Sequence, residues 1–253
     1  MPIGDEFKPR RRGEGFGGKT IQMQDRLIGN SYYEEPSGVS KHDNPHGKYR
    51  GRPIIASAYR DGIEEVPING GVYLGGGQRE AIVVDESIEK ESLLIETYKQ
   101  LIQRRGRKVD EGIDFKKGIL GEVFELVKET LPYDLDGVLE IVREKGVEND
   151  GKISLSVFIQ AKKGVCRHQA LLVGYLLERL QRDGLVTGKV SVDRNYIPGV
   201  GGHAWVRYIS GSGDVYIIDP AQDYFGKLDE VPAGDERRYI WDYRRAEEKK
   251  VNI

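Results

Sequence analysis

The chain has 253 residues, with 39 Lys and Arg against 41 Asp and Glu and a formal net charge of −2. A length of this order allows one large domain, or one domain with a smaller appendage. With charge so nearly balanced, nothing in the overall composition points to a nucleic-acid partner or to an anionic membrane. No run of about 18 or more apolar residues occurs, which excludes a spanning helix. We therefore expect a globular protein with no nucleic-acid partner and no membrane partner, and the sequence leaves its oligomeric state open.

Residues 1–50 are rich in Gly, Arg, Tyr and polar residues and show no sustained periodicity. We expect them to form a flexible or draped N-terminal arm. The first residues, MPIGDEFKPRRRGEGFGGK, include basic residues but no apolar stretch, so they do not match a secretory signal. The single cysteine, Cys166, cannot form an intrachain disulfide, which is typical of a reducing compartment. We expect a cytoplasmic protein and leave open export by a route without a cleaved signal.

Residues 51–85 alternate short apolar runs with glycine-rich turns, a pattern that is typical of strands. The runs PIIASAY, GVYL and AIVV are separated by DG, NGG and GGG. This segment predicts a strand-rich extension, followed by the main domain over residues 86–253.

Three helices are predicted in the first half of the main domain. The first begins at Ser87, which is the expected N-cap, and ends at Gly106. The second covers Phe115–Thr130, where apolar residues recur at helical spacing. The third covers Asp136–Lys145, with Gly146 as its expected C-cap.

The stretch GVCRHQALLVGYLLERL predicts a fourth helix, over residues 166–182, that begins at the only cysteine. Val173, Leu176, Leu177 and Leu180 share one face of it. Strand-like runs follow, namely GKVSV, HAWVRY, DVYIID and, near the end, RRYIWDYRR. Helices followed by an antiparallel-looking sheet indicate an α+β fold.

Cys166 lies in the first turn of this predicted helix, where unpaired N–H groups and the helix dipole favour a thiolate. Lys162, Lys163 and Arg167 add positive charge nearby in the sequence. Most free cysteines are small buried apolar residues, and that interpretation holds unless other catalytic groups accompany the thiol. A nucleophilic thiol needs a base within hydrogen-bond reach and a third group that orients the base.

His203 is the histidine best placed to act as that base. The two histidines of KHDNPH lie in a loop-like segment, and His168 lies about 200° around the helix from Cys166. His203 enters the run HAWVRY, and Asp219 ends the run VYIID, which is expected to pair antiparallel beside it. The three residues follow in the order Cys, His, Asp at separations of 37 and 16 residues.

The blocks GVCRHQALLVGYLL, GGHAWVRY and VYIIDPAQDYFG resemble those of the transglutaminase-like superfamily, over roughly residues 115–226. The resemblance implies a papain-like core, with helices packed on an antiparallel sheet, and makes residues 86–253 a transglutaminase-like catalytic domain. It implies that Cys166 is the nucleophile, His203 the general base and acid, and Asp219 the orienting residue of a catalytic triad. The superfamily contains transglutaminases, cysteine proteases, deamidases and peptide N-glycanases, which attack an amide-type carbonyl and pass through a thioester.

Two further residues are candidates for the site. Gln160 lies six residues before the cysteine, the spacing at which papain-like proteases place their oxyanion-hole glutamine. The chain lacks the local papain signature around its cysteine, so a plain surface amide is the alternative interpretation of Gln160. Trp205 shares a strand face with His203 by period two, and it either walls the site or packs in the core.

Two other motifs suggest ligands that their context does not support. The stretch GEGFGGKT, Gly13–Thr20, satisfies the phosphate-loop pattern but lacks the preceding strand that the mechanism requires. The stretch ENDGKIS resembles the middle of a calcium loop, but Gly146 and Val157 occupy the positions of the outer carboxylates. Cys166 and His168 are too few for a structural zinc site. We therefore expect no metal and no cofactor.

The sequence thus predicts a cysteine-dependent thiol hydrolase or acyltransferase that acts on a protein or peptide substrate at an amide or glutamine side chain. Water would make it a protease or deamidase, and a second amine would make it a transglutaminase. Two alternatives stay open, namely a non-catalytic protein-interaction module on the same scaffold and a nucleotide-binding protein that uses Gly13–Thr20.

Overall fold

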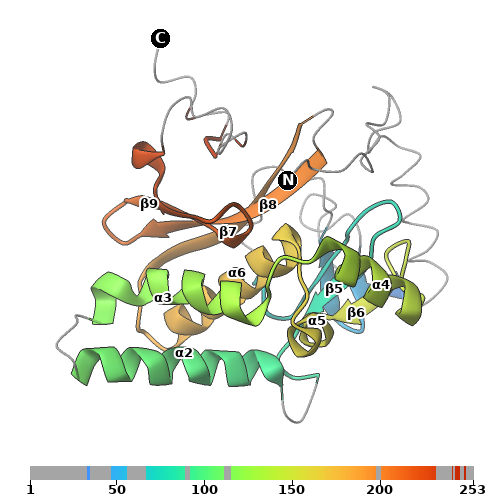
Figure 1. Ribbon diagram of the computed structural model, residues 1–253, viewed down its shortest axis with the longest axis horizontal. Coiled ribbons are helices and arrows are strands. Elements are labelled where there is room, and N and C mark those ends of the chain that lie inside the picture. The colour runs from blue at the N-terminus through green and yellow to red at the C-terminus, as the bar shows by residue number, and fades with distance from the viewer. Residues whose placement is uncertain are drawn as a thin grey trace.

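The computed structural model describes residues 33–34, 47–55, 67–88, 92–110, 115–197, 201–231, 241, 243–245 and 248. These residues form a mixed structure in which helices pack against two sheets (Figure 1), so the predicted α+β class is confirmed. The motifs GEGFGGKT and KHDNPH lie outside the described residues, as does most of the run RRYIWDYRR.

The first sheet combines short strands from the N-terminal third of the chain with one strand from its middle. Its order is β1-β2-β3-β4-β5-β6. The pairs β3–β4 and β5–β6 are parallel, and the other pairs are antiparallel. The predicted strands within residues 51–85 are confirmed as β3, β4 and β5. The strands are Tyr33–Glu34 (β1), Lys48–Tyr49 (β2), Arg52–Ile55 (β3), Gly71–Tyr73 (β4), Ala81–Val84 (β5) and Lys152–Ser154 (β6).

The second sheet is antiparallel throughout and has the order β10-β9-β8-β7. Three of its strands are the predicted runs GKVSV, HAWVRY and DVYIID, of which the first two are longer than predicted and the third begins one residue later. The described residues of RRYIWDYRR lie outside any strand, so the strand predicted there is not found among them. The strands are Gly188–Ile197 (β7), Gly201–Ser210 (β8), Val215–Asp219 (β9) and Tyr224–Lys227 (β10).

Five α-helices and two short 3-10 helices occur among the described residues. The predicted helices over 115–130, 136–145 and 166–182 are confirmed to within one residue at each end, whereas α5 was not predicted. The helices are Leu93–Asp110 (α2), Phe115–Thr130 (α3), Leu135–Lys145 (α4), Leu155–Ala161 (α5), Cys166–Arg182 (α6), Pro220–Gln222 (η1) and Leu228–Glu230 (η2).

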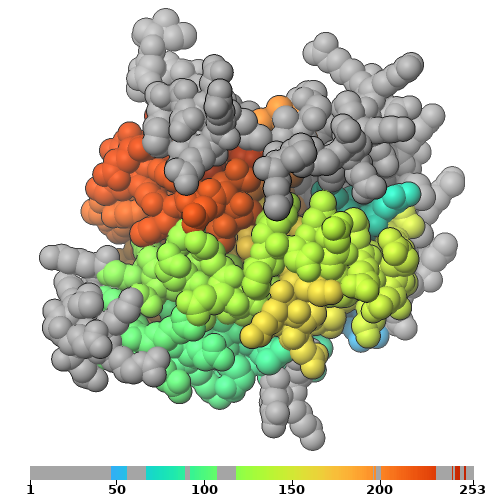
Figure 2. Space-filling model, viewed as in Figure 1, coloured from blue at the N-terminus to red at the C-terminus, as the bar shows by residue number. Residues whose placement is uncertain are grey.

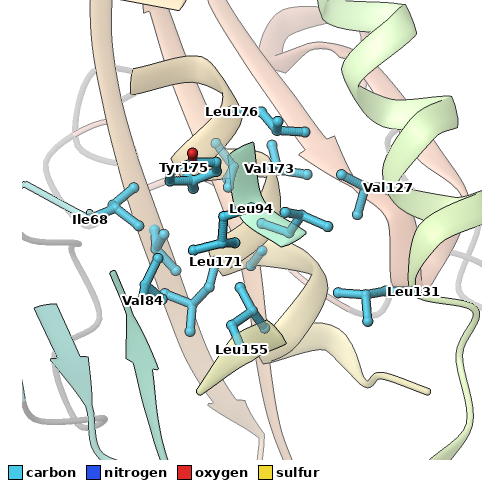
Figure 3. Close-up of a cluster of buried hydrophobic side chains, with 14 of the residues drawn as sticks. Ile68, Val84, Leu94, Val127, Leu131, Leu155, Leu171, Val173, Tyr175 and Leu176 are labelled. Carbon is cyan, nitrogen blue, oxygen red and sulfur yellow. The ribbon is translucent and has the colours of Figure 1, made fainter. Parts of the chain in front are cut away.

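Helix α6 is the central element of the core. Its residues from His168 to Leu177 are all buried, and it contacts both sheets as well as α2, α3 and α5. Figure 3 shows side chains of α6 packed among Val84 from β5, Leu94 from α2 and Val127 from α3. A helix that is apolar on nearly all sides is typical of a fully buried position.

Strand β7 returns along α6 after a short turn. The backbone N–H of Leu185 donates to the carbonyl of Leu180, and Nε2 of Gln181 donates to the carbonyl of Gly188 at 2.8 Å. The strand and the helix are therefore antiparallel, and residues farther along β7 lie nearer to the N-terminus of α6. This arrangement places the β7–β8 pair beside Cys166.

Helix α3 covers the other side of the buried core. In Figure 2 its yellow-green side chains lie between green α2 and the orange-red second sheet. Phe124 stacks on Phe225 of β10 with ring centroids 5.9 Å apart, and Lys128 contacts Asp223 beside η1.

The first predicted helix differs from the structure at both ends. Ser87 does not cap it, because both the backbone N–H and the hydroxyl of Ser87 donate to Oδ1 of Asp85, which holds Ser87 in a turn. The helix begins instead at Leu93 and continues through Gly106 to Asp110. A single exposed glycine weakens a helix without ending it, so a stop at Gly106 was wrong.

Gly146 ends α4 as predicted. It adopts φ 59°, and its N–H donates to the carbonyl of Arg143, which is a left-handed cap that favours glycine. The turn that follows leads into β6, so the calcium-like stretch ENDGKIS is a helix-to-strand connection.

The predicted division at residues 85 and 86 is not marked by separate cores. Ile55, Tyr73 and Ile82 from the predicted extension pack in one cluster with side chains of α2, α3 and α6. The described part of the predicted arm consists of β1 and β2 and the residues that adjoin β2. The domain limits themselves stay a prediction.

No helix within the described ranges is long and apolar enough to cross a bilayer.

Gly106 and Gly146 give a matched pair of predictions. A Cβ at either position would meet no heavy atom within 4 Å, but only Gly146 has a positive φ. We expect Gly106→Ala to raise the free energy of unfolding by about 0.5–1 kcal/mol, because alanine restricts the unfolded chain and favours the helix. We expect Gly146→Ala to lower it by about 1 kcal/mol, because alanine is strained in the left-handed region. Urea unfolding measures both, and a loss of stability in Gly106→Ala would contradict the helix assignment.

Candidate active site

Cys166 is the first residue of α6. The preceding helix, α5, ends at Ala161 and is capped by Lys162, whose φ of 53° turns the chain. Val165 is extended before α6 begins. Gly164 forms a parallel bridge with Tyr133, which ties this connection to the segment before α4. As the first helical residue, Cys166 has a backbone N–H without an intrahelical acceptor and lies at the positive end of the helix dipole.

His203 and Asp219 come together because their strands are antiparallel neighbours. His203 lies near the start of β8 and Asp219 is the last residue of β9, and the register pairs Val206 with Ile218. Nε2 of His203 lies 2.5 Å from Oδ2 of Asp219, and both side chains are buried. The pairing expected from the sequence is therefore present.

The thiol of Cys166 interacts with the imidazole of His203 and with the backbone N–H of Ala204, and both interactions lower its pKa. Because Nε2 of His203 is bonded to Asp219, the ring nitrogen left for the thiol is Nδ1. The structure thus brings the three sequence-predicted residues Cys166, His203 and Asp219 together, because the thiol interacts with the imidazole and the imidazole is bonded to the carboxylate.

Electrostatics at the site favour a charged pair. Burial raises the pKa of the Cys166 thiol, but the hydrogen bond and charge of His203, the charge of Arg167 and the Ala204 N–H outweigh it, so the net pKa is lowered. Burial lowers the pKa of His203, but the charge and hydrogen bond of Asp219 and the contact with Cys166 raise it to about 10. Both shifts act in the direction of a thiolate that faces an imidazolium.

Asp219 is held by neutral donors. Its Oδ1 accepts from the backbone N–H of Gln222 at 3.2 Å, which caps η1, and its Oδ2 accepts from the hydroxyl of Tyr243 at 2.9 Å. Pro220 begins η1 directly after it. The carboxylate is therefore fixed in orientation toward His203.

Aromatic rings enclose the imidazole. Trp241 stacks on His203 with centroids 4.7 Å apart and an interplanar angle of 24°, and Trp205 lies 5.9 Å away. Tyr243 packs edge-on against Trp205 and stacks on Tyr224. Both interpretations of Trp205 hold, because it is buried in this cluster and also borders His203. An apolar enclosure excludes water and strengthens the charge interactions inside it.

Glu80 fixes the first turn of α6 to the first sheet. The carboxylate is fully buried just before β5, and Arg167 binds it through Nε at 3.1 Å and through Nη2 at 2.6 and 2.7 Å. Burial raises the pKa of Glu80, but the charge of Arg167 and contacts with His168 lower it to about 2. Arg167 directly follows Cys166, so this ion pair restrains the backbone that carries the thiol.

His168 does not face the thiol, as predicted from helix geometry. Its Nδ1 accepts from the backbone N–H of Val165 at 3.2 Å, and its Nε2 lies 2.9 Å from Glu80 without hydrogen-bond alignment. Its ring also packs on Phe158. Burial lowers the pKa of His168 to about 4 despite Glu80, so this ring is neutral near neutral pH.

The basic residues near Cys166 in the sequence do not contribute equally. Arg167 lowers the pKa of the thiol as predicted. Lys162 forms the C-cap of α5, and Lys163 pairs with Glu140 of α4 at 3.1 Å, so neither acts on the thiol.

Gln160 lies exposed near the end of α5, and its side chain makes no hydrogen bond among the described residues. Nothing in its contacts links it to Cys166 or His203, and its role as an oxyanion donor stays a prediction.

Within the part of the chain that is described, no three His, Cys, Asp or Glu side chains gather as a metal site would require.

Sequence reasoning missed the groups that support the triad from a distance. Glu80 lies 87 residues from its partner Arg167, and no local pattern marks it. Trp241 and Tyr243 belong to RRYIWDYRR, which was interpreted as a strand. Trp205 was a candidate by its spacing from His203, but Trp241 and Tyr243 reach the histidine only after the chain has folded back.

Comparison with protein-family models, curated proteins and solved structures finds no significant match to this chain.

The ion pair predicts an alkylation profile. We expect iodoacetamide to alkylate Cys166 with a plateau that extends below pH 7, whereas an unperturbed thiol titrates near pH 8.5. His203→Ala removes the cation and hydrogen-bond partner, so the profile should move toward that of an ordinary thiol. Rates measured from pH 5 to 9 test this, with His168→Asn as the control that should leave the midpoint nearly unchanged. An identical profile in wild type and His203→Ala would contradict the pairing.

The buried ion pair predicts acid-dependent stability. The pKa of Glu80 is lowered in the folded state, so its contribution is present above the unfolded value of 4.5 and is lost as the pH falls toward 2. We expect Glu80→Ala to lower the free energy of unfolding by about 3 kcal/mol at pH 7, because Arg167 is left without its partner. The difference in the free energy of unfolding between Glu80→Ala and wild type should be smaller at pH 3 than at pH 7.

The control is Glu129→Ala, which removes a carboxylate from the exposed pair with Arg104. This change should cost less than about 1 kcal/mol. Denaturant unfolding at the two pH values measures all three proteins, and equal effects of the two substitutions would contradict the role assigned to Glu80.

Proposed function

We propose that this protein is a cysteine-dependent amide hydrolase or acyltransferase of the transglutaminase-like type. The observation that carries the proposal is the continuous chain from the Cys166 thiol through His203 to Asp219. A nucleophile, a base and a residue that orients the base are the groups that acyl transfer requires. The shifted pKa values of the first two add support, because perturbed titrations concentrate at functional sites.

A papain-like arrangement is part of the proposal. A helix that presents a cysteine at its N-terminus packs on an antiparallel sheet, and the histidine and aspartate lie on adjacent strands of that sheet. This agrees with the blocks GVCRHQALLVGYLL, GGHAWVRY and VYIIDPAQDYFG that resemble the transglutaminase-like superfamily.

The reaction follows from the protonation states. The Cys166 thiolate attacks the carbonyl carbon of an amide on a protein or peptide, and the carbonyl oxygen takes the negative charge. The imidazolium of His203 gives its proton to the leaving amine or ammonia, and a thioester remains. Neutral His203 then takes a proton from water or from a second amine as it attacks the thioester, and the acid or new amide is released.

The developing oxyanion needs donors that are already in place. The backbone N–H of Cys166 is one candidate, because the first residue of a helix has no intrahelical acceptor for it. The side chain of Gln160 remains the second candidate. We favour hydrolysis over transfer because hydrolysis requires no site for a second amine.

The decisive substitution is Cys166→Ala. We expect it to reduce amide turnover by roughly a thousandfold or more, because no other group supplies the nucleophile. The assay uses reduced casein as the probe and measures new amino groups, released ammonia and incorporation of a fluorescent primary amine. These readouts separate protease, deamidase and transglutaminase activity.

Unfolding by urea serves as the control, because Cys166→Ala is a small change that should leave the fold intact. Turnover that persists in the folded variant would contradict the proposal. Absence of turnover in wild type, together with an ordinary thiol titration, would favour a non-catalytic protein-interaction module.

A further inference from the structure

Three arginines from segments far apart in the sequence carry positive charge that acts on the thiol. Arg167 follows Cys166 in α6, Arg79 precedes Glu80 before β5, and Arg194 lies on β7. Each of the three interacts electrostatically with Cys166. The charge of Arg167 is taken up by the carboxylate of Glu80. Arg194 has no such carboxylate among the described residues, so its charge near the thiol needs another explanation.

The return of β7 along α6 directs Arg194 toward the site. A Cβ on Gly174 of α6 would lie 3.4 Å from Cγ2 of Val192, so this part of β7 packs against the middle of the helix. Arg194 lies two residues farther along and shares the face of Val192, and the strand runs toward the N-terminus of α6. In the neighbouring strand Arg194 pairs with Ala204, whose backbone N–H lowers the pKa of the Cys166 thiol.

Arg194 has no counter-ion among the described residues. Its guanidinium makes no hydrogen bond and no ion pair there. The groups that act on its charge are Tyr73, Cys166, Arg167 and Arg79. Burial raises the pKa of Tyr73, so that hydroxyl is neutral. Burial lowers the pKa of Arg194 to about 10, which leaves it charged at neutral pH. The thiolate is therefore the only anion of this set.

A partly buried guanidinium without a carboxylate is costly unless a ligand supplies the missing charge. Stabilisation of the thiolate alone does not require it, because His203, Arg167 and the Ala204 N–H already lower the pKa of the thiol. A guanidinium binds carboxylates in a bidentate geometry that few other groups match.

We propose that Arg194 binds a carboxylate of the substrate beside the carbonyl that Cys166 attacks. The inference rests on the proposed function and specifies its substrate class, namely amides with a negatively charged group close to the reacting carbon. An acidic side chain and a free chain terminus present the same carboxylate chemistry.

The test compares two alkylating reagents of nearly equal size. Iodoacetate carries a carboxylate and iodoacetamide does not, and both react with the same thiolate. Their rate ratio therefore cancels any change in the pKa of Cys166. Relative to a small neutral thiol, the ratio of iodoacetate to iodoacetamide should be raised in wild type. Arg194→Gln should lower it roughly tenfold, because a charge near the reacting atom is removed, while Arg194→Lys should retain much of it.

Arg104→Gln is the matched control, since it removes an arginine from an exposed pair on α2 and should leave the ratio unchanged. The imidazolium of His203 attracts iodoacetate in every variant, so only the difference between variants is interpreted. A ratio that is the same in folded Arg194→Gln and wild type overturns the proposal.

A second measurement on wild type does not depend on the folding of any variant. N-acetylaspartic acid α-amide and N-acetylglycine present a side-chain and a terminal carboxylate, and either should slow iodoacetamide alkylation in a saturable way. The one that protects at lower concentration identifies the source of the carboxylate. N-acetylasparagine amide is the neutral control. Equal lack of protection by all three overturns the proposal.

Alkylation requires no amide turnover, so the two hypotheses fail separately. If the alkylation ratio depends on Arg194 but the protein shows no amide turnover, the carboxylate site is supported and the proposed function is contradicted. If the protein turns over amides but the alkylation ratio does not depend on Arg194, the proposed function is supported and the carboxylate site is contradicted.

Discussion

The ion pair between Glu80 and Arg167 joins the first sheet to the first turn of α6, and the geometry around the thiol depends on that restraint. A fully buried carboxylate is expensive, and here two guanidinium nitrogens meet it, with an imidazole nitrogen also close by. Because Arg167 directly follows Cys166, the contact limits both the position and the rotation of the helix start. The sulfur then meets His203, which reaches it from the second sheet. The candidate site thus lies where two sheets meet across one buried helix.

The charges at this junction form a sequence of alternating sign. Asp219 faces His203, His203 faces the Cys166 thiolate, and Arg194 lies beyond the thiolate with no carboxylate of its own among the described residues. Each charge in the middle of this sequence has an opposite charge on either side. The guanidinium at its end has no second anion among the described residues, as the carboxylate site proposed above requires. The aromatic rings of Trp241 and Trp205 reduce solvent near the histidine, which strengthens these interactions.

Local patterns predicted much of the fold and the order of the triad. Helical spacing of apolar residues predicted α3, α4 and α6, because each of these helices buries an apolar face. Gly146 was predicted as a cap because its conformation depends on neighbouring residues alone. The start of α2 was missed because Asp85 binds Ser87 in a competing turn. Glu80 and Arg194 could not be predicted, since their roles depend on contacts between segments far apart in the sequence. The position of Cys166 against His203 was inferable only from three blocks considered together.

The two buried histidines near α6 show why one of them is suited to be the base. Both lie close to a carboxylate, at 2.9 Å for His168 and Glu80 and at 2.5 Å for His203 and Asp219. Glu80 is already neutralised by Arg167, so it stabilises an imidazolium poorly, and burial lowers the pKa of His168 to about 4. The other partners of Asp219 are the Tyr243 hydroxyl and the Gln222 N–H, which are uncharged. Its full negative charge therefore acts on His203 and raises the pKa of that ring to about 10, against the effect of burial. Proximity to a carboxylate does not by itself make a histidine cationic; the carboxylate must also lack another cation.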